Sequence, residues 1–475
     1  MALPEKPPVV TILGHVDHGK TTLLDYIRKT KLAAKEIGEI TQAIGAYQIE
    51  FKGKKITFID TPGHAAFSEM RSRGAKVADI VVLVIAVNDG VMPQTLESIK
   101  IIKEANVPVI IALNKIDLPG ASIDKVKTQL AENGVLVEGY GGNVVAVPLS
   151  AKTGQGVDQL LEMILLTAEM EELKADPAGT LEAEVIEAKA DKFCGPVGTV
   201  VIKNGTLKKG DRLTADGVTA KVKLLKDEWG RAVSDAKPAD PAQILGFTSL
   251  PAVGAVVRRL GEIPPEGEAA AVSQRPALAP KPEGKLSIIL KADVAGSLEA
   301  ILNCLPDEVQ VAEAGVGEVT ESDVLLAKTF GVGIYTFNLP LRGTVAKLAE
   351  TEGVKVKSFR IIYDLLGDLE KRILKILEPT IDRKILGKAE IIAAFDIRGE
   401  KIAGARVLEG KINRNRPIVV QRDNQIIAET KVTSLKQEKQ DINEAVVGTE
   451  FGIVFAGKVD FKEGDMILSY SLEEK

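Results

Sequence analysis

The stretch GHVDHGKT, Gly14 to Thr21, constrains the fold of this chain more than any other feature. It matches the pattern GxxxxGK followed by Ser or Thr, it follows the apolar run VVTIL, and it precedes the helical pattern TTLLDYIRK. A loop between a strand and a helix surrounds an anion with backbone N–H groups and a helix N-terminus. We therefore predict a phosphate-binding loop. A glycine-rich turn without a ligand is the alternative, and the flanking strand and helix argue against it.

The residues of this loop have separate expected roles. Lys20 adds a point charge for the β and γ phosphates, and the Thr21 hydroxyl can ligate Mg²⁺. His15 and His18 are expected to shape the loop, not to do chemistry. The residues predicted to contact the nucleotide here are Asp17, His18, Gly19, Lys20, Thr21 and Thr22.

Short apolar runs alternate with amphipathic stretches from residue 9 to residue 170. The runs are VVTIL (9–13), ITFID (56–60), IVVLVIAV (80–87), VPVIIAL (107–113) and VVAVPLS (144–150). Such alternation is typical of a parallel sheet wrapped by helices. The pattern predicts an α/β nucleotide-binding domain.

Three more polar loops follow strands of this pattern. Asp60 can reach the metal through water, and the Gly63 N–H can meet the γ phosphate without a side chain in the way. Asp117 of NKID can accept hydrogen bonds from the N1–H and the N2 amino group of guanine, which adenine lacks. Asn114 and Lys115 brace that loop, and SAK, made of Ser150, Ala151 and Lys152, can present a backbone N–H to guanine O6. Because all four loops occur in order at strand ends, we predict a site for GTP and GDP, although each motif alone would fit a polar turn.

His64 is one of only three histidines in the chain, and it follows Gly63 directly. Hydrolysis of GTP needs a water placed in line with the γ phosphorus and little covalent help. His64 is well placed to orient that water and to stabilise charge. The alternative is a histidine packed against the next helix.

The pattern of predicted elements changes after the first domain. From Thr180 to about Leu260, short strands separated by Gly and Asp turns predict a small β-barrel. Residues 261–284 are rich in Pro, Ala and Glu and are typical of a linker. A second α/β unit follows. Residues 364–378 then predict a long helix with one apolar face, which could join two domains as a semi-rigid rod.

The last segment is predicted to repeat the first barrel. GTVVIKNGTLKKGDRL (198–213) aligns with AGARVLEGKINRNRPI (403–418), KVKLLK (221–226) aligns with KVTSLK (431–436), and LGF (245–247) falls near EFG (450–452). The predicted architecture is therefore multidomain, α/β plus β. Its domains are a GTPase domain with a parallel-type sheet (1–175), a β-barrel (176–262), a linker with a small α/β/α domain (263–363), a connecting helix (364–379) and a second β-barrel (380–475).

Composition limits where this chain works and what it binds. The net charge of −5 excludes a global basic field, so any RNA contact must be local. The longest apolar run, Ile80 to Val87, is far shorter than the roughly 20 residues of a membrane helix. The two cysteines, Cys194 and Cys304, fall in different predicted domains, which fits a reducing compartment. With no secretory signal visible, we expect a cytoplasmic protein without a membrane partner.

GHVDHGKT, DTPGHAAF, NKID and SAK together resemble the translational GTPase superfamily. GEITQAIGAY (38–47), KADVAGSLEAI (291–301) and GVGEVTESDVLLA (315–327) further resemble bacterial-type translation initiation factor two, from Val9 to the C-terminus but without the family's long N-terminal region. The resemblance implies GTP, GDP and Mg²⁺ as ligands, with Thr21, Thr41 and Asp60 at the metal. It also implies that His64 is the catalytic histidine, active when the ribosome holds it in position.

The same resemblance assigns the last barrel to the formylmethionyl end of initiator tRNA. The expected contacts there are Lys411, Arg414, Arg416, Arg422, Glu450 and Phe451. A solvated basic loop explains the four cations equally well. The chain also departs from the family: Ala405 and Phe451 stand where cysteines are common, Gln437 replaces an arginine, Phe193 and Cys194 replace Gly-Arg, and Glu39 and Ala43 replace Gly and His. These departures predict an altered pocket for formylmethionine, but none removes a nucleotide contact.

The resemblance predicts a monomeric translation initiation factor. In its GTP form it would bind initiator tRNA and promote joining of the small and large ribosomal subunits, alongside other initiation factors, and then hydrolyse GTP. Two alternatives stay open. One is another tRNA-delivering GTPase, and the other is a GTP-regulated assembly module that never handles tRNA.

Overall fold

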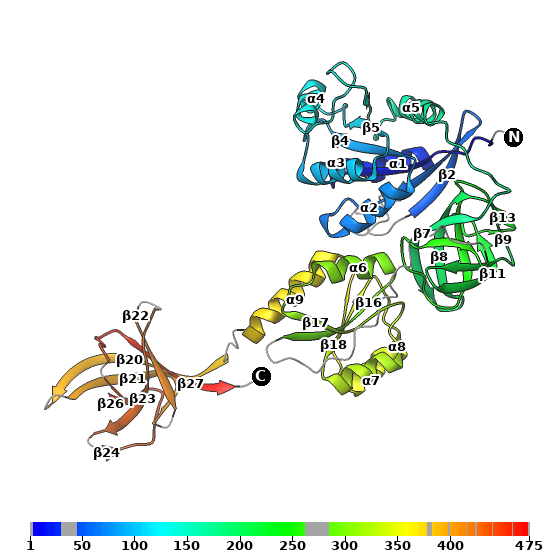
Figure 1. Ribbon diagram of the computed structural model, residues 1–475. Coiled ribbons are helices and arrows are strands. Elements are labelled where there is room, and N and C mark those ends of the chain that lie inside the picture. The colour runs from blue at the N-terminus through cyan, green and yellow to red at the C-terminus, as the bar shows by residue number, and fades with distance from the viewer. Residues whose placement is uncertain are drawn as a thin grey trace. The chain divides into compact units, whose positions relative to one another are not determined.

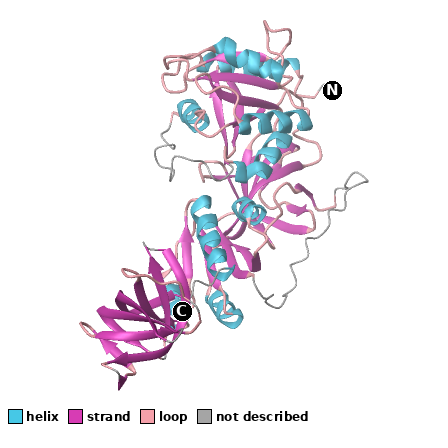
Figure 2. Cartoon of the chain, turned by 90° about the vertical axis from the view of Figure 1, so that its left-hand side faces the viewer, coloured by secondary structure: helices cyan, strands magenta, loops and turns pink. Residues whose placement is uncertain are grey.

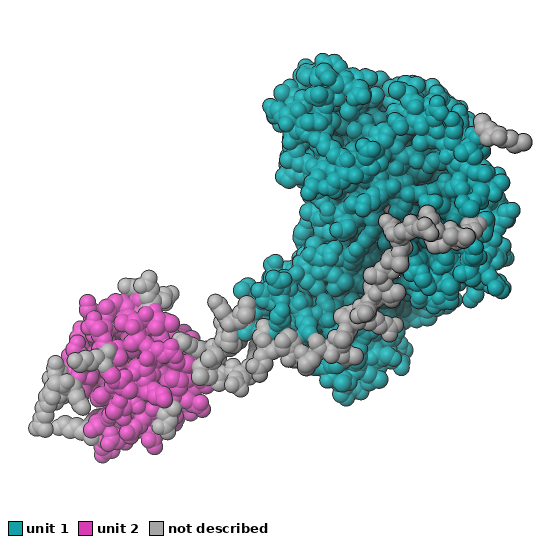
Figure 3. Space-filling view, viewed as in Figure 1, with its two compact units in different colours: residues 1–376 teal, residues 377–475 magenta. Residues whose placement is uncertain are grey.

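A computed structural model describes residues 3–29, 45–261, 285–377, 382–397, 400–414, 416–422, 425–438, 440–457 and 459–473. Thr41, Glu39 and Ala43, and residues 262–284 of the predicted linker, lie outside these ranges. The chain divides into two compact units, residues 1–376 and residues 377–475, which Figure 3 colours separately. In the described residues, no helix combines the length and the apolar character needed to cross a bilayer.

The first part of unit one is a six-stranded sheet of order β2-β3-β1-β4-β5-β6 (Figure 1). All neighbouring pairs are parallel except β2 with β3. Its strands are β1 (Val9–Gly14), β2 (Gly45–Phe51), β3 (Lys54–Asp60), β4 (Ile80–Ala86), β5 (Val109–Asn114) and β6 (Val145–Pro148). The five predicted runs are confirmed as strands. The strand β2 was not predicted, because its first residues belong to a stretch interpreted only as a resemblance to a switch region.

Helices cover both faces of this sheet, which explains why every residue of β4 is buried. The helices are α1 (Lys20–Arg28), α2 (Ser68–Val77), α3 (Pro93–Ala105), α4 (Ile123–Glu132) and α5 (Val157–Met170), with the short 3₁₀ turn η2 (Ala65–Phe67) before α2. One core holds Leu23 of α1 and Leu160 of α5, and the core on the other face holds Ile99 of α3 and Val126 of α4. The predicted α/β domain is therefore a three-layer sandwich.

The next part of unit one is a closed barrel. Its sheet runs β10-β15-β7-β8-β14-β11, and β10 pairs with β11 to close it. The strands are β7 (Glu182–Asp191), β8 (Gly195–Asn204), β10 (Arg212–Ala215), β11 (Val218–Lys226), β14 (Pro241–Phe247) and β15 (Val256–Arg259), with the short strands β9 (Leu207–Lys208), β12 (Ala232–Val233) and β13 (Asp235–Ala236) at its margin. In the loop between β11 and β12, Trp229 follows Glu228, and the Glu228 carboxylate accepts a hydrogen bond from Gln48 N of β2 at 3.4 Å.

The last part of unit one is a small sandwich around a four-stranded parallel sheet of order β17-β16-β18-β19. Its elements are β16 (Leu286–Ala292), α6 (Ala295–Cys304), β17 (Val309–Val316), α7 (Glu321–Phe330), β18 (Gly333–Phe337), α8 (Gly343–Thr351), β19 (Val356–Phe359) and α9 (Ile362–Leu377). The helices α6 and α9 share one core and α7 and α8 another. The first half of α9 packs on this domain, because Ile362, Leu365 and Leu369 are fully buried in its core, whereas Leu374 and Ile376 farther along are exposed. That α9 joins two domains as a semi-rigid rod stays a prediction.

Unit two is built from strands, as Figure 2 shows by its colours. They are β20 (Asp382–Ile397), β21 (Glu400–Asn413), β22 (Pro417–Arg422), β23 (Gln425–Gln437), β24 (Gln440–Asp441), β25 (Glu444–Val446), β26 (Glu450–Phe455) and β27 (Met466–Glu473). The order β22-β27-β20-β21-β26-β23 closes through the pair of β22 with β23. This order equals that of the first barrel, strand for strand, so the predicted repeat is confirmed.

Pairing registers show which parts of the predicted alignment hold. Leu225 lies opposite Ile244 in the first barrel, and Leu435 lies opposite Ile453 in the second. KVKLLK and KVTSLK are therefore equivalent, as predicted. Ile244 and Ile453 are then equivalent too, which places the counterpart of LGF at residues 454–456. The predicted match to EFG is wrong by four residues, because apolar alternation in a strand repeats every two residues and fits several registers.

Candidate nucleotide-binding site

The four predicted loops meet at one edge of the six-stranded sheet. In parallel pairing Ile12 lies beside Asp60, Ala86 beside Asn114, and Leu113 beside Pro148. The loops after β1, β3, β5 and β6 therefore all leave the sheet at its carboxyl edge. That edge is where open α/β sheets bind their ligands.

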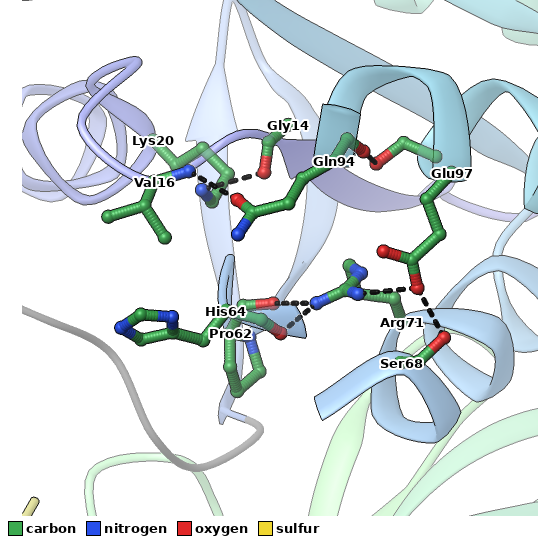
Figure 4. Close-up of polar contacts among 10 residues, drawn as sticks. Gly14, Val16, Lys20, Pro62, His64, Ser68, Arg71, Gln94 and Glu97 are labelled. Atoms are coloured by element: carbon green, nitrogen blue, oxygen red, sulfur yellow. Dashed lines mark hydrogen bonds and ion pairs between the residues drawn. The ribbon is translucent and has the colours of Figure 1, made fainter. Parts of the chain in front are cut away.

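Lys20 lies at the centre of the phosphate loop and is almost fully buried. Its Nζ donates to Gly14 O at 2.9 Å and to His15 O at 2.6 Å, as Figure 4 shows for Gly14. Burial lowers the pKa of Lys20 to about 8, and the charge of Asp60 opposes that shift. Burial removes water from the Lys20 ammonium group and so disfavours its charged form. A bound phosphate would stabilise that charge in place of the lost water.

Gly63 lies against this lysine. A Cβ on residue 63 would come within 2.3 Å of Lys20 Nζ. Any side chain there would displace the ammonium group, so the glycine permits the backbone of the loop after β3 to approach the phosphate position.

Asn114 joins three of the loops. Its Nδ2 donates to His18 O at 2.8 Å, and its Oδ1 accepts from Ala151 N at 2.9 Å. The amide thus holds the phosphate loop and the SAK loop to the NKID loop. Asp117 is exposed, and a hydrogen bond from Ser150 lowers the pKa of its carboxyl group. An ionised, accessible carboxylate beside a fixed loop can accept two donors from a base.

The other predicted contacts line the same edge. Lys115 has a positive φ of 65° and forms an ion pair with Asp89 at 3.5 Å. Asp17, Thr22 and Lys152 are exposed there. His18 is buried, its Nδ1 lies 3.3 Å from Val84 O, and burial lowers its pKa to about 4, so the ring is neutral at physiological pH.

Two of the three predicted metal residues are described by the structure. Thr21, in the first turn of α1, is partly exposed, and Asp60, at the end of β3, is buried close enough to Lys20 for its charge to raise the lysine's pKa. A hydroxyl and a carboxylate are the hard oxygen ligands that Mg²⁺ prefers. The donor set therefore fits the ion. Thr41 lies outside the described residues.

His64 begins the segment that leads from Gly63 into η2. Its side chain is partly exposed, and burial followed by the charge of Lys20 lowers the pKa of its ring. Its Nδ1 lies 2.8 Å from the hydroxyl of Tyr363, which belongs to α9. A neutral imidazole can both accept and donate a proton, as a group that orients water must.

Sequence reasoning missed a buried arginine behind His64. Arg71 of α2 is fully buried, and its guanidinium donates to Pro62 O at 3.3 Å, to His64 O and to Glu97 Oε1 at 2.7 Å (Figure 4). It therefore fixes the backbone on both sides of Gly63. No sequence signal marks it, because a single arginine on an amphipathic helix is normally an exposed residue.

Four of the six residues predicted to contact tRNA are bonded to other groups of unit two. Lys411 is paired with Glu444 at 3.1 Å, Arg422 makes two hydrogen bonds of 2.9 Å to Asp465, and Glu450 is paired with Arg406. Arg414 donates to Thr433 O, and Arg416 is exposed. Phe451 is buried in the barrel core opposite Ala405, because alternate residues of β26 point inward, so its ring is not presented at the surface.

Three family models match this chain, and they follow one another in the same order as the three parts of unit one. The model of the Elongation factor Tu GTP binding domain matches residues 5–170, that of Elongation factor G domain 2 matches residues 180–259, and that of Translation-initiation factor 2 matches residues 274–370. With the parallel sheet and the loops at its carboxyl edge, these matches define a P-loop GTPase of the translation-factor class.

Two relatives narrow the class to one family. Proteins named Translation initiation factor IF-2 from Thermoanaerobacter sp. (strain X514) and from Caldanaerobacter subterraneus subsp. tengcongensis are 45% and 46% identical to this chain. The matches cover 99% of this chain and 72% and 70% of the relatives. The chain belongs to the translation initiation factor IF-2 family, and it is a GTPase of translation initiation that binds GTP and GDP.

A solved structure, GDP-bound aIF5B from Aeropyrum pernix, is 27% identical. Its match covers 98% of this chain and 92% of that protein, with a TM-score of 0.48. An overlap of that quality adds no argument to the assignment.

Proposed function

We propose that the GTP-bound chain binds formylmethionyl initiator tRNA, promotes joining of the ribosomal subunits and then hydrolyses GTP on the ribosome. The observation that supports this proposal most directly is the convergence of four loops at the carboxyl edge of the sheet. The phosphate loop, Gly63, NKID and SAK meet there, and His64 directly follows Gly63. Membership of the initiation-factor family supports the rest.

In this proposal each loop has one task. Lys20 and the N-terminus of α1 hold the phosphates, and Asp117 reads the base through two hydrogen bonds. Thr21, Asp60 and Thr41 would hold Mg²⁺, which neutralises charge on the phosphates when it is bound. His64 positions the water that attacks the γ phosphorus.

Unit two is the proposed holder of the initiator tRNA. Arg416 and Arg414 lie near a turn beside β22, where cations can contact phosphates without reading sequence. The pairing of Phe451 with Ala405 fills the barrel interior at positions where the family resemblance implies cysteines. We therefore propose a weaker discrimination of the formyl group than the family pattern implies.

One assay separates the proposal from its alternatives. The full chain with GTP is mixed with formylated initiator tRNA, unformylated initiator tRNA or an elongator tRNA, and hydrolysis of the aminoacyl ester is followed. Protection of the initiator forms is the expected result. Protection of elongator tRNA alone would indicate a tRNA-delivering factor of another kind. Protection of none would support a GTP-regulated assembly module, which the ion pairs of Lys411 and Arg422 also favour.

A further inference from the structure

The contact between His64 and Tyr363 joins residues 299 positions apart in the sequence. The Tyr363 hydroxyl lies 2.8 Å from His64 Nδ1, and the two rings meet edge to face with centroids 4.6 Å apart. In Figure 4 the His64 ring extends to the opposite side of its backbone from the Arg71 guanidinium. The backbone of His64 and its ring are therefore held by different partners, Arg71 and Tyr363.

The tyrosine has a fixed position because of its neighbours on α9. Ile362 and Leu365, on either side of Tyr363, are fully buried in a core that also contains Phe67 and Met70 from the segment after His64. Farther along α9, Asp368 accepts from the hydroxyl of Tyr335 at 2.9 Å. The backbone of Tyr363 is held by these contacts and cannot follow the His64 ring unless α9 shifts against η2 and α2, whereas, among the described residues, the half-exposed phenol ring is held only by its contact with His64.

We propose that Tyr363 is a positioning residue that restrains His64 in the ribosome-free protein, and that release of this contact is part of activation. The inference rests on the proposed catalytic role of His64. While the hydroxyl occupies Nδ1 and the edge contact fixes the ring, that nitrogen cannot contact the attacking water. Tyr363 belongs to α9, the helix that ends unit one. A displacement of α9 would separate the Tyr363 hydroxyl from His64 and so release the ring.

The test is Tyr363→Phe in the full chain, measured as GTP hydrolysis with and without ribosomes. Loss of one restraining hydrogen bond is expected to raise the ribosome-independent rate about two- to tenfold and to leave the ribosome-stimulated rate unchanged. The matched control is Tyr140→Phe, which removes a tyrosine hydroxyl bonded to Asp124 of α4 at 2.9 Å and touches neither α9 nor His64, and its rates should equal those of the wild type. The double variant Tyr363→Phe with His64→Ala should lose the gain.

A second readout does not depend on turnover. Since the chain has only three histidines, ¹⁵N signals of their imidazole rings can be assigned by His→Ala variants. Tyr363→Phe should change the tautomer signals of His64 and leave those of His15 and His18 unchanged. A purely structural tyrosine would change none of them.

Other outcomes overturn the inference. A fall in the ribosome-stimulated rate of Tyr363→Phe would show that the tyrosine places His64 productively, and unchanged rates with unchanged His64 signals would show that the contact has no role. If His64→Ala keeps full ribosome-stimulated hydrolysis, the catalytic role of His64 itself fails, which is a separate result.

Discussion

The two barrels have the same strand order but are used differently by the chain. The first barrel is built into unit one: Thr57 Oγ1 of β3 donates to Ala239 O at 2.7 Å, and Glu187 of β7 accepts from Gly296 N of α6 at 3.2 Å. The second barrel makes up unit two with its own closed core. The same barrel topology therefore occurs once as part of a larger compact unit and once as a unit by itself. The difference lies in the outward-facing residues, which bond to neighbouring domains in the first barrel.

The interiors also differ in how they fill the same space. Val200 pairs with Ala242 in the first barrel, and the equivalent positions in the second are Ala405 and Phe451. The larger residue of the pair lies on β8 in the first barrel, as Val200, and on β26 in the second, as Phe451. All four residues are buried. The same strand pair therefore accommodates side chains of different size in the two barrels.

Phe451→Ala should have the largest effect of the changes considered. Removing a buried ring costs about 3–5 kcal/mol. We expect hydrogen exchange to accelerate throughout unit two and not in unit one. The variant Ala405→Val with Phe451→Ala recreates the pair of the first barrel and should recover part of the loss. Faster exchange in both units would contradict the separation of the two cores.

His64→Ala should affect only the chemistry of unit one. Ribosome-stimulated hydrolysis is expected to fall about a hundredfold or more while GTP affinity stays nearly unchanged. Lys431→Ala, an exposed change in unit two, is the control and should leave hydrolysis intact. An equal loss of nucleotide affinity would show that the His64 side chain is structural.

Glu187→Gln tests the contact by which the first barrel joins α6. The second barrel has Ala393 at the equivalent place, opposite Gly404. Burial raises the pKa of Glu187 to about 7, so between its ordinary value and pH 7 the folded chain holds a proton that the unfolded chain has lost. Stability therefore falls as pH rises through this window, by about 3–4 kcal/mol from this group.

The glutamine variant should lack that part of the pH dependence in denaturant unfolding between pH 5 and pH 7.5. Gln can still accept the Gly296 N–H, so the variant should match or exceed the wild type at pH 7.5. Glu184→Gln, on the same strand but paired with Lys203 at 2.7 Å, is the matched control. Parallel curves for wild type and Glu187→Gln would show that Glu187 is ionised in the folded chain.

Gly205→Ala and Gly410→Ala should have the smallest effects, about 1–3 kcal/mol each. Both glycines have positive φ, and a Cβ would meet backbone atoms at 2.8 Å in the first barrel and at 2.1 Å in the second. The cost should be larger at Gly410. Gly448→Ala, also at positive φ but in open space, measures the conformational cost alone. Equal midpoints for all three in chemical denaturation would remove the role assigned to the collisions.

Local patterns predicted the strands of the first sheet and the loops at their carboxyl ends, because each such motif depends on residues close together in sequence. GHVDHGKT or NKID can be recognised without knowing what packs against it. The burial of Arg71, the contact of Tyr363 with His64 and the packing of α9 all depend on segments far apart in the chain, so no window of sequence contains them. The failed LGF alignment has another cause, since a two-residue period permits several registers.

The chain has one tryptophan, Trp229, and its neighbour Glu228 accepts a hydrogen bond from β2 of the GTPase domain. Intrinsic fluorescence excited at the indole therefore reports on the joint between the first barrel and that domain, and unit two is spectroscopically silent. Any emission change caused by a ligand bound only to unit two would be a direct measure of communication between the units, without a label.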